Sequence, residues 1–151
     1  MKYTTYLRAQ SQLSESGPED SPPDKQTKLD IGQLLGRWIN TNTATRNIKE
    51  VMLTNDNGDL SLRVLGASDP DPHDWGEVPV KYLFADELDS RTAISFTAEY
   101  DFDFQHTELQ TNLNLGLMIV TSLNTFKDNI AKSDYFSREY FYQKPISNDE
   151  I

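Results

Sequence analysis

The stretch LLGRWINTN, from Leu34 to Asn42, decides the fold that we predict for this chain. Gly36 lets the backbone turn sharply, and a strand is expected to begin directly after it. Trp38, Asn40 and Asn42 then share one face, because side chains alternate along an extended chain. The sequence therefore predicts that an indole and two amides point to the same side of a first strand.

A short helix is predicted just before this strand. Ile31, Leu34 and Leu35 are spaced at i, i+3 and i+4, so they would share one helical face. Asp30 is a suitable N-cap, because its carboxylate can accept hydrogen bonds from the first amides of a helix.

Composition limits the kinds of partner. A length of 151 residues fits one domain with a real core. The 14 Lys and Arg against 24 Asp and Glu give a formal charge of -10, which disfavours nucleic acid and anionic membranes as partners. The chain has no cysteine, no apolar run of transmembrane length and no signal-peptide pattern at its N-terminus. These features predict a cytoplasmic protein without a membrane or nucleic-acid partner.

Eight short strands are predicted, with no long helix between them. They cover 37–42, 47–54, 60–66, 78–84, 94–99, 106–114, 117–126 and 134–143. Asn57-Gly58 is a strong hairpin turn, since both residues accept a positive φ. The acidic residues around it raise the alternative of a calcium loop, but the oxygen ligands do not continue with EF-hand spacing.

Hairpin connections make these strands antiparallel. An eight-stranded up-and-down β-barrel would leave no exposed edge, and its interior would be filled by side chains or hold one small ligand. A small β-sandwich is the competing architecture. The predicted tight turns would collect at one end and the two longest loops, 68–77 and 127–133, at the other, as expected for a cup with a working rim.

The Gly36-x-Trp38 opening, the strand count and the domain size resemble lipocalins and avidin-like proteins, the calycin group of β-barrels. The resemblance covers about residues 31–144. The domain organisation predicted is a flexible N-terminal arm or lid (1–28), a lipocalin-like β-barrel (29–145) and a C-terminal tail (146–151). The arm is rich in Ser, Pro and acidic residues, which favours a solvated segment. Its apolar residues, such as Tyr6 and Leu7, leave the alternative of a lid.

The resemblance also implies roles for individual residues. Trp38 would be a structural plug at the barrel floor, with Arg138 from the last strand packed over it or lying higher in the cavity. Asn40 matches the position of a pocket-lining asparagine in avidin-like proteins, and Asn42 follows on the same face. A ligand hydrogen bond and an internal network are equally open for these amides. The further polar and tryptophan residues of a biotin site are absent.

Aromatic residues at strand spacing suggest a wall around a ligand, with ordinary core packing as the alternative. The predicted wall consists of Tyr82, Phe84, Phe96, Tyr140 and Tyr142. A buried tyrosine offers both apolar area and a hydroxyl for hydrogen bonding.

His73 and His106 lie in or beside the predicted rim loops, close in sequence to carboxylates. With Tyr140 they are the candidate catalytic residues, because imidazole beside carboxylate suits proton transfer near neutral pH. The two histidines lack the close spacing of a zinc site, so neither a metal nor a cofactor is predicted. Trp75 is interpreted as a structural residue tucked over the rim.

Three functions remain open from the sequence. The first is binding of a small, largely apolar molecule inside the barrel, with Asn40, Asn42, Tyr82, Phe84, Phe96, Arg138 and Tyr140 as ligand-binding residues. The second is a cofactor-independent cyclase or isomerase acting in the same cavity, by analogy with calycin-like natural-product cyclases. The third is an interaction module, and a homodimer is a possible assembly.

Overall fold

The computed structural model describes residues 29–68, 70–128 and 130–145. The predicted arm (1–28) and tail (146–151) lie outside the described residues. The described chain forms nine antiparallel strands joined in one sheet, in the order β4-β3-β2-β1-β9-β8-β7-β6-β5. The strands are β1 (Gly36–Asn40), β2 (Ile48–Asp56), β3 (Asp59–Gly66), β4 (His73–Pro79), β5 (Tyr82–Ala85), β6 (Ala93–Asp101), β7 (Gln105–Asn114), β8 (Leu117–Phe126) and β9 (Tyr135–Gln143).

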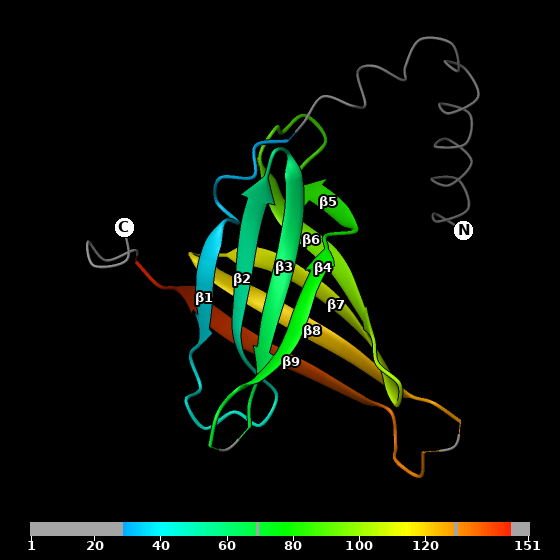
Figure 1. The fold of residues 1–151 in the computed structure, drawn as a ribbon. Coiled ribbons are helices and arrows are strands. Elements are labelled where there is room, and N and C mark those ends of the chain that lie inside the picture. Colours follow the sequence, from blue (N-terminus) through cyan, green and yellow to red (C-terminus); the bar gives the residue numbers. More distant parts are fainter. Residues whose placement is uncertain (1–28, 69, 129, 146–151) are drawn as a thin grey trace, which may run out of the picture.

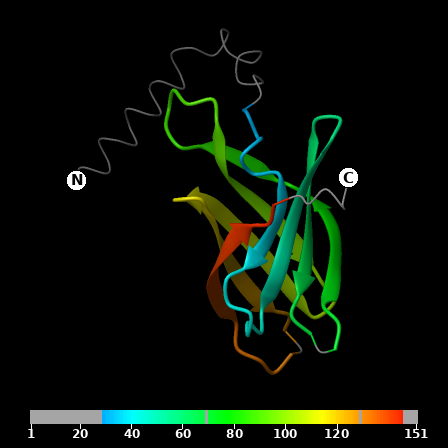
Figure 2. The same cartoon turned by 90° about the vertical axis from the view of Figure 1, so that its left-hand side faces the viewer.

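The sheet is curled into a half-barrel, so that β2 to β4 face β6 to β8 across its interior (Figures 1 and 2). The predicted antiparallel up-and-down topology is confirmed, whereas the predicted count of eight strands is wrong. The expected fourth strand is divided at Val80 and Lys81. Val80 N donates to Leu60 O of β3, and Lys81 N donates to Thr97 O of β6. The chain thus passes from one edge of the sheet to the other at this point.

Where β4 and β6 approach one another, a side chain takes the place of a hydrogen-bonded ladder. The Tyr100 hydroxyl donates to Gly76 O at 2.7 Å and also approaches Leu62 O at 3.4 Å. Burial raises the pKa of Tyr100 well above its usual range. Tyr100 therefore serves as a neutral cross-link over the seam of the half-barrel.

The predicted helix at residues 30–35 is wrong. Leu34 N donates to Ile31 O, which closes a single turn, and Asp30 Oδ1 accepts a hydrogen bond from Gly32 N. Asp30 also bonds through its backbone to Arg91 and Ala93. Too few residues separate this bridge from Gly36 to offset the cost of helix nucleation. No helix that could span a membrane occurs among the described residues.

The closed end of the half-barrel contains the apolar core. Trp38 is 2% exposed there, and its Nε1 donates to Leu34 O at 2.9 Å. Register places Trp38 opposite Val51 of β2 and Gln143 of β9. The buried apolar side chains around it include Leu34, Val51, Leu53, Leu62, Val64, Phe96, Leu109, Met118, Val120 and Phe141.

The predicted separation of tight turns from longer loops holds only in part, because the long connection 86–92 lies at the closed end, the short connection 102–104 lies at the other end, and most of the predicted 68–77 loop belongs to β4. The β2–β3 turn has positive φ at Asn57 and Gly58, and the β7–β8 turn has positive φ at Leu115 and Gly116. The connections 41–47, 67–72, 102–104 and 127–134 surround the other end, which we call the mouth.

Candidate binding site

Inward-facing side chains near the mouth are polar, and they form a hydrogen-bonded network between β7 and β8. Gln105 Nε2 donates to Thr107 Oγ1 at 2.7 Å and to Asn124 Oδ1 at 2.9 Å. Thr107 Oγ1 also donates to Asn124 Oδ1, at 2.8 Å. All three residues are buried. The network adds polar groups to the interior near the mouth, where they lie beside apolar and aromatic residues such as Ile48 and Trp75.

Asn124 is the centre of this network, and its amide is fully used. Its Oδ1 accepts two hydrogen bonds, and its Nδ2 donates to Ser122 Oγ and to Tyr135 O. An asparagine side chain has two donor hydrogens and two acceptor lone pairs. Asn124 therefore positions its neighbours and has no capacity left for a ligand.

The pair of hydroxyl groups next to Asn124, those of Ser122 and Ser137, has one hydrogen-bond donor to spare. Ser122 Oγ and Ser137 Oγ are 2.6 Å apart, and either can be the donor. The pair has two hydroxyl protons for this single hydrogen bond, so one proton has no acceptor among the described residues. Ser122 lines the cavity at the mouth, and the pair can donate to a molecule that carries an acceptor.

The cavity at the mouth, the mouth pocket, has a volume of about 290 Å³. Its lining residues are Arg46, Asn47, Ile48, Gly66, Ala67, Ser68, His73, Trp75, Ser122, Asn124 and Tyr135. The pocket thus joins the inner polar network to two aromatic rings and to the rim loops. It is close to the lower limit of the usual range for small-molecule sites, about 300–1,000 Å³.

Trp75 is held at the rim by aromatic contacts. Its ring packs edge-to-face on Tyr100, with centroids 5.4 Å apart, and on Phe102, at 5.5 Å. Gly66 lies directly beneath the indole, because a Cβ added there would be 2.5 Å from Trp75 Nε1. Trp75 was expected in the 68–77 loop, whereas it lies within β4; its structural role at the rim stays a prediction.

Glu139 stabilises the other side of the mouth. It points inward from β9, and its Oε2 accepts a hydrogen bond from Thr45 Oγ1 at 2.5 Å. Its Oε1 is 3.5 Å from the Ile48 amide nitrogen, at the limit of a hydrogen bond. Both oxygens face the β1–β2 connection, so Glu139 anchors this loop.

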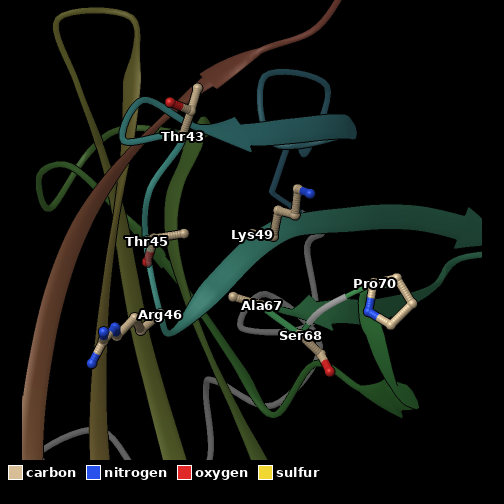
Figure 3. Close-up of a pocket in the computed structure, with 7 residues that line it drawn as sticks. All are labelled: Thr43, Thr45, Arg46, Lys49, Ala67, Ser68 and Pro70. Atoms are coloured by element: carbon tan, nitrogen blue, oxygen red, sulfur yellow. The ribbon is translucent and has the colours of Figure 1, made fainter.

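A second cavity of about 370 Å³ lies between the β1–β2 and β3–β4 loops (Figure 3). It shares Arg46, Ala67 and Ser68 with the mouth pocket. Arg46 and Lys49 extend in different directions in Figure 3, so the two cations do not converge on one anion. We therefore treat this cavity as an outer extension of the mouth pocket.

The predicted amide ligands have local partners. Asn40 is 3% exposed, its Nδ2 donates to Ile48 O, and its Oδ1 accepts from Asn42 N. Asn42 lies beyond the end of β1, and its Oδ1 accepts from Ala44 N. Of the two alternatives for Asn40, the structure has the internal network, which shapes the β1–β2 connection.

The predicted aromatic wall does not line the interior. Of its members, Phe96 is fully buried in the core, whereas Tyr82, Phe84, Tyr140 and Tyr142 are 43–59% exposed on the outer face. Val78 and Val80 pack against the core before the crossing and Leu83 packs against it afterwards, so the inward positions change from even to odd numbers and Tyr82 and Phe84 point outward.

Arg138 also points outward, because it is opposite Thr121 on the face that carries Tyr140. The expectation that Arg138 packs over Trp38 or enters the cavity is therefore wrong. Gln143 is the residue of β9 that lies opposite Trp38.

The two histidines are placed differently. His106 is on the outer face of β7, where its Nδ1 is 3.7 Å from Asp101 Oδ1. Lys127 contacts the same carboxylate at 3.0 Å and holds the pKa of Asp101 below its usual value. Only His73 borders the mouth pocket. The structure does not bring His73, His106 and Tyr140 together.

A surface ion pair sets the pKa of a carboxyl group beside the mouth. Arg63 donates to Asp74, which also accepts a hydrogen bond from Gly76 N, and these bonds lower the pKa of Asp74.

We expect Arg63→Gln to raise the pKa of Asp74 toward its usual value, as measured by carboxyl NMR titration, with Asp101 as the unchanged internal control. The lowered pKa means that the contribution of Asp74 to stability is present above its unfolded pKa and is lost as pH falls through the folded pKa. An unchanged Asp74 pKa in Arg63→Gln would contradict this assignment.

The described residues contain no group of three or more His, Asp or Glu that could hold a metal ion. They form an antiparallel β half-barrel with a pocket at one end, an arrangement compatible with a calycin-like fold. Comparison with protein-family models, curated proteins and solved structures gave no match for this chain.

Proposed function

We propose that this protein binds a small molecule in the mouth pocket. The observation that carries the proposal is the junction of three features at one cavity. Trp75 and Tyr135 offer ring surface, the Ser122–Ser137 pair offers a spare hydroxyl proton, and Asn124 is held in place by its own saturated network. Concave sites with apolar walls and a few fixed polar groups are typical of small-molecule binding.

The pocket chemistry narrows the ligand class. The mouth pocket combines ring surface with a spare hydroxyl proton, so we propose a compact molecule with an apolar or aromatic body. A carbonyl or another acceptor on that body would take the spare hydroxyl proton. This proposal moves the binding residues from the strand faces predicted by sequence to the rim of the half-barrel.

A relationship with lipocalin-like or avidin-like barrels belongs to the same proposal. Two features support it: the Gly36-x-Trp38 opening of the first long antiparallel hairpin, and the indole of Trp38 at the closed end. A cyclase or isomerase has less support, since His73 borders the pocket without a carboxylate hydrogen bond among the described residues.

Native mass spectrometry of the purified full-length protein tests the proposal, because a bound guest appears as an added mass. Ala67 lines both cavities, so Ala67→Phe should fill the mouth and reduce the occupied fraction at least tenfold. Ala44→Phe, on an exposed loop residue that lines neither cavity, is the matched control and should retain the added mass. The absence of a guest from the unaltered protein, or an equal guest content in Ala67→Phe, would refute the proposal.

A further inference from the structure

β9 carries exposed aromatic side chains on its outer face, although its inward face also holds Phe141 in the core and Tyr135 at the mouth pocket. Its inward side chains include Ser137 and Glu139, whereas Phe136, Tyr140 and Tyr142 point outward. These three rings are 61%, 43% and 45% exposed. Antiparallel strands with one solvated face usually direct their polar residues to solvent. Packing in the core therefore does not explain the aromatic side chains on the outer side of β9.

The aromatic side chains continue into the neighbouring strands. Tyr142 is opposite Ile39 of β1 and Leu117 of β8, Tyr140 is opposite Ile119, and Phe136 is opposite Leu123. Ile119 is only 5% exposed although it is on the outer side of the sheet. We call this surface the outer aromatic face; it consists of Ile39, Leu117, Ile119, Leu123, Phe136, Arg138, Tyr140 and Tyr142.

The charge of this face differs from that of the whole chain. The protein has 24 Asp and Glu residues, yet none occupies an outward position of β8 or β9. Two molecules with a formal charge of -10 repel one another over most of their surfaces. They can approach through β8 and β9, whose outward positions carry no carboxylate; at the borders of the face, Glu50 lies opposite Ile39 and pairs with Arg37, and Glu108 lies opposite Leu123. Enrichment in Tyr, Phe and Arg with depletion of acidic residues is typical of the centre of a protein interface.

The face is also complementary to itself. Arg138 lies between Phe136 and Tyr140 on the same side of β9, and it is exposed. A guanidinium group stacks favourably on an aromatic ring. A two-fold axis brings each patch against its own copy, so Arg138 of one molecule can meet a ring of the other. We propose that the outer aromatic face binds a second copy of this chain to form a symmetric dimer.

Sedimentation equilibrium of the full-length protein over a range of concentrations tests the dimer. We expect a monomer–dimer equilibrium, and we expect Phe136→Asp and Tyr142→Asp each to raise the dissociation constant at least tenfold, or about 1.4 kcal/mol. The matched controls are Tyr82→Asp and Phe84→Asp, which make the same changes at exposed aromatic residues of β5. These controls should leave the dissociation constant unchanged.

Circular dichroism of each variant separates a lost interface from a lost fold. If an aspartate variant unfolds, Arg138→Glu tests the dimer instead, because it keeps all the aromatic rings. In a symmetric dimer it would add a negative charge to each of the two facing surfaces. It should also raise the dissociation constant at least tenfold. A monomer at every concentration would overturn the proposal; this is the result expected if residues 1–28 or a different protein occupy the face. Equal weakening of dimerisation by the β5 controls would overturn it as well. The occupied fraction of the mouth pocket is measured separately, so failure of either proposal leaves the other unaffected.

Discussion

Replacing Trp38 with alanine is expected to lower the free energy of unfolding by about 3–5 kcal/mol, the usual cost of removing a large buried ring. Trp38 is 2% exposed and packs in the core with Leu34 and Phe141. Its position in β1 pairs with both β2 and β9, so the ring supports the joint between the two halves of the sheet. Urea unfolding followed by far-ultraviolet circular dichroism measures the change.

Two variants control this measurement. Trp38→Phe keeps most of the ring but removes the N–H that donates to Leu34 O, so its loss should be smaller, about 1–3 kcal/mol. Leu88→Ala removes a side chain that is 99% exposed and should change stability by less than about 0.5 kcal/mol. If Trp38→Ala were no more costly than Leu88→Ala, Trp38 would not be the plug of the closed end.

Gly66→Ala should disturb the mouth pocket through Trp75. The new Cβ would be 2.5 Å from Nε1 and 3.2 Å from Cε2 of the indole, so the ring must move. Tyr100 and Phe102 hold Trp75 edge-to-face, and displacement breaks these contacts. We expect a loss of about 1–3 kcal/mol in urea unfolding, the usual cost of overpacking. The guest content measured by native mass spectrometry should fall at least tenfold.

A double-mutant cycle isolates the contact between Gly66 and Trp75. In a Trp75→Leu background the indole is absent, so adding a methyl group at residue 66 should cost less than about 0.5 kcal/mol in urea unfolding. An equal cost of Gly66→Ala in both backgrounds would show that the glycine is required for another reason, and Trp75 would not depend on it.

The strand pattern could be predicted because it depends on local rules. Alternation in the third predicted strand assigned Leu60, Leu62 and Val64 to one face, and all three are buried in the structure. Asn57-Gly58 also forms the predicted hairpin turn with positive φ at both residues. Backbone conformation and side-chain alternation extend over a few residues, so a single sequence contains the information for them.

Which face of a strand points to the interior depends on contacts between residues far apart in the chain. Phe136, Arg138, Tyr140 and Tyr142 of β9 share a face as expected, but alternation alone cannot tell which face is inward, and in the structure this face points outward. Hydrogen bonds from Val80 to β3 and from Lys81 to β6 divide the fourth predicted strand, and Leu83 rather than Tyr82 then packs against the core. A one-residue slip reverses every side chain that follows.

By itself, the sequence determined an acidic, cysteine-free antiparallel β protein whose first strand opens with Gly-x-Trp. Only the tertiary structure decided that the mouth is lined by a saturated Asn124 network and by Trp75, and that Phe136, Tyr140 and Tyr142 of β9 face outward. The physical reason is that strand periodicity is a local property. A pocket and an exposed face arise from pairings between residues far apart in the chain, such as Thr45 with Glu139 and Gly66 with Trp75.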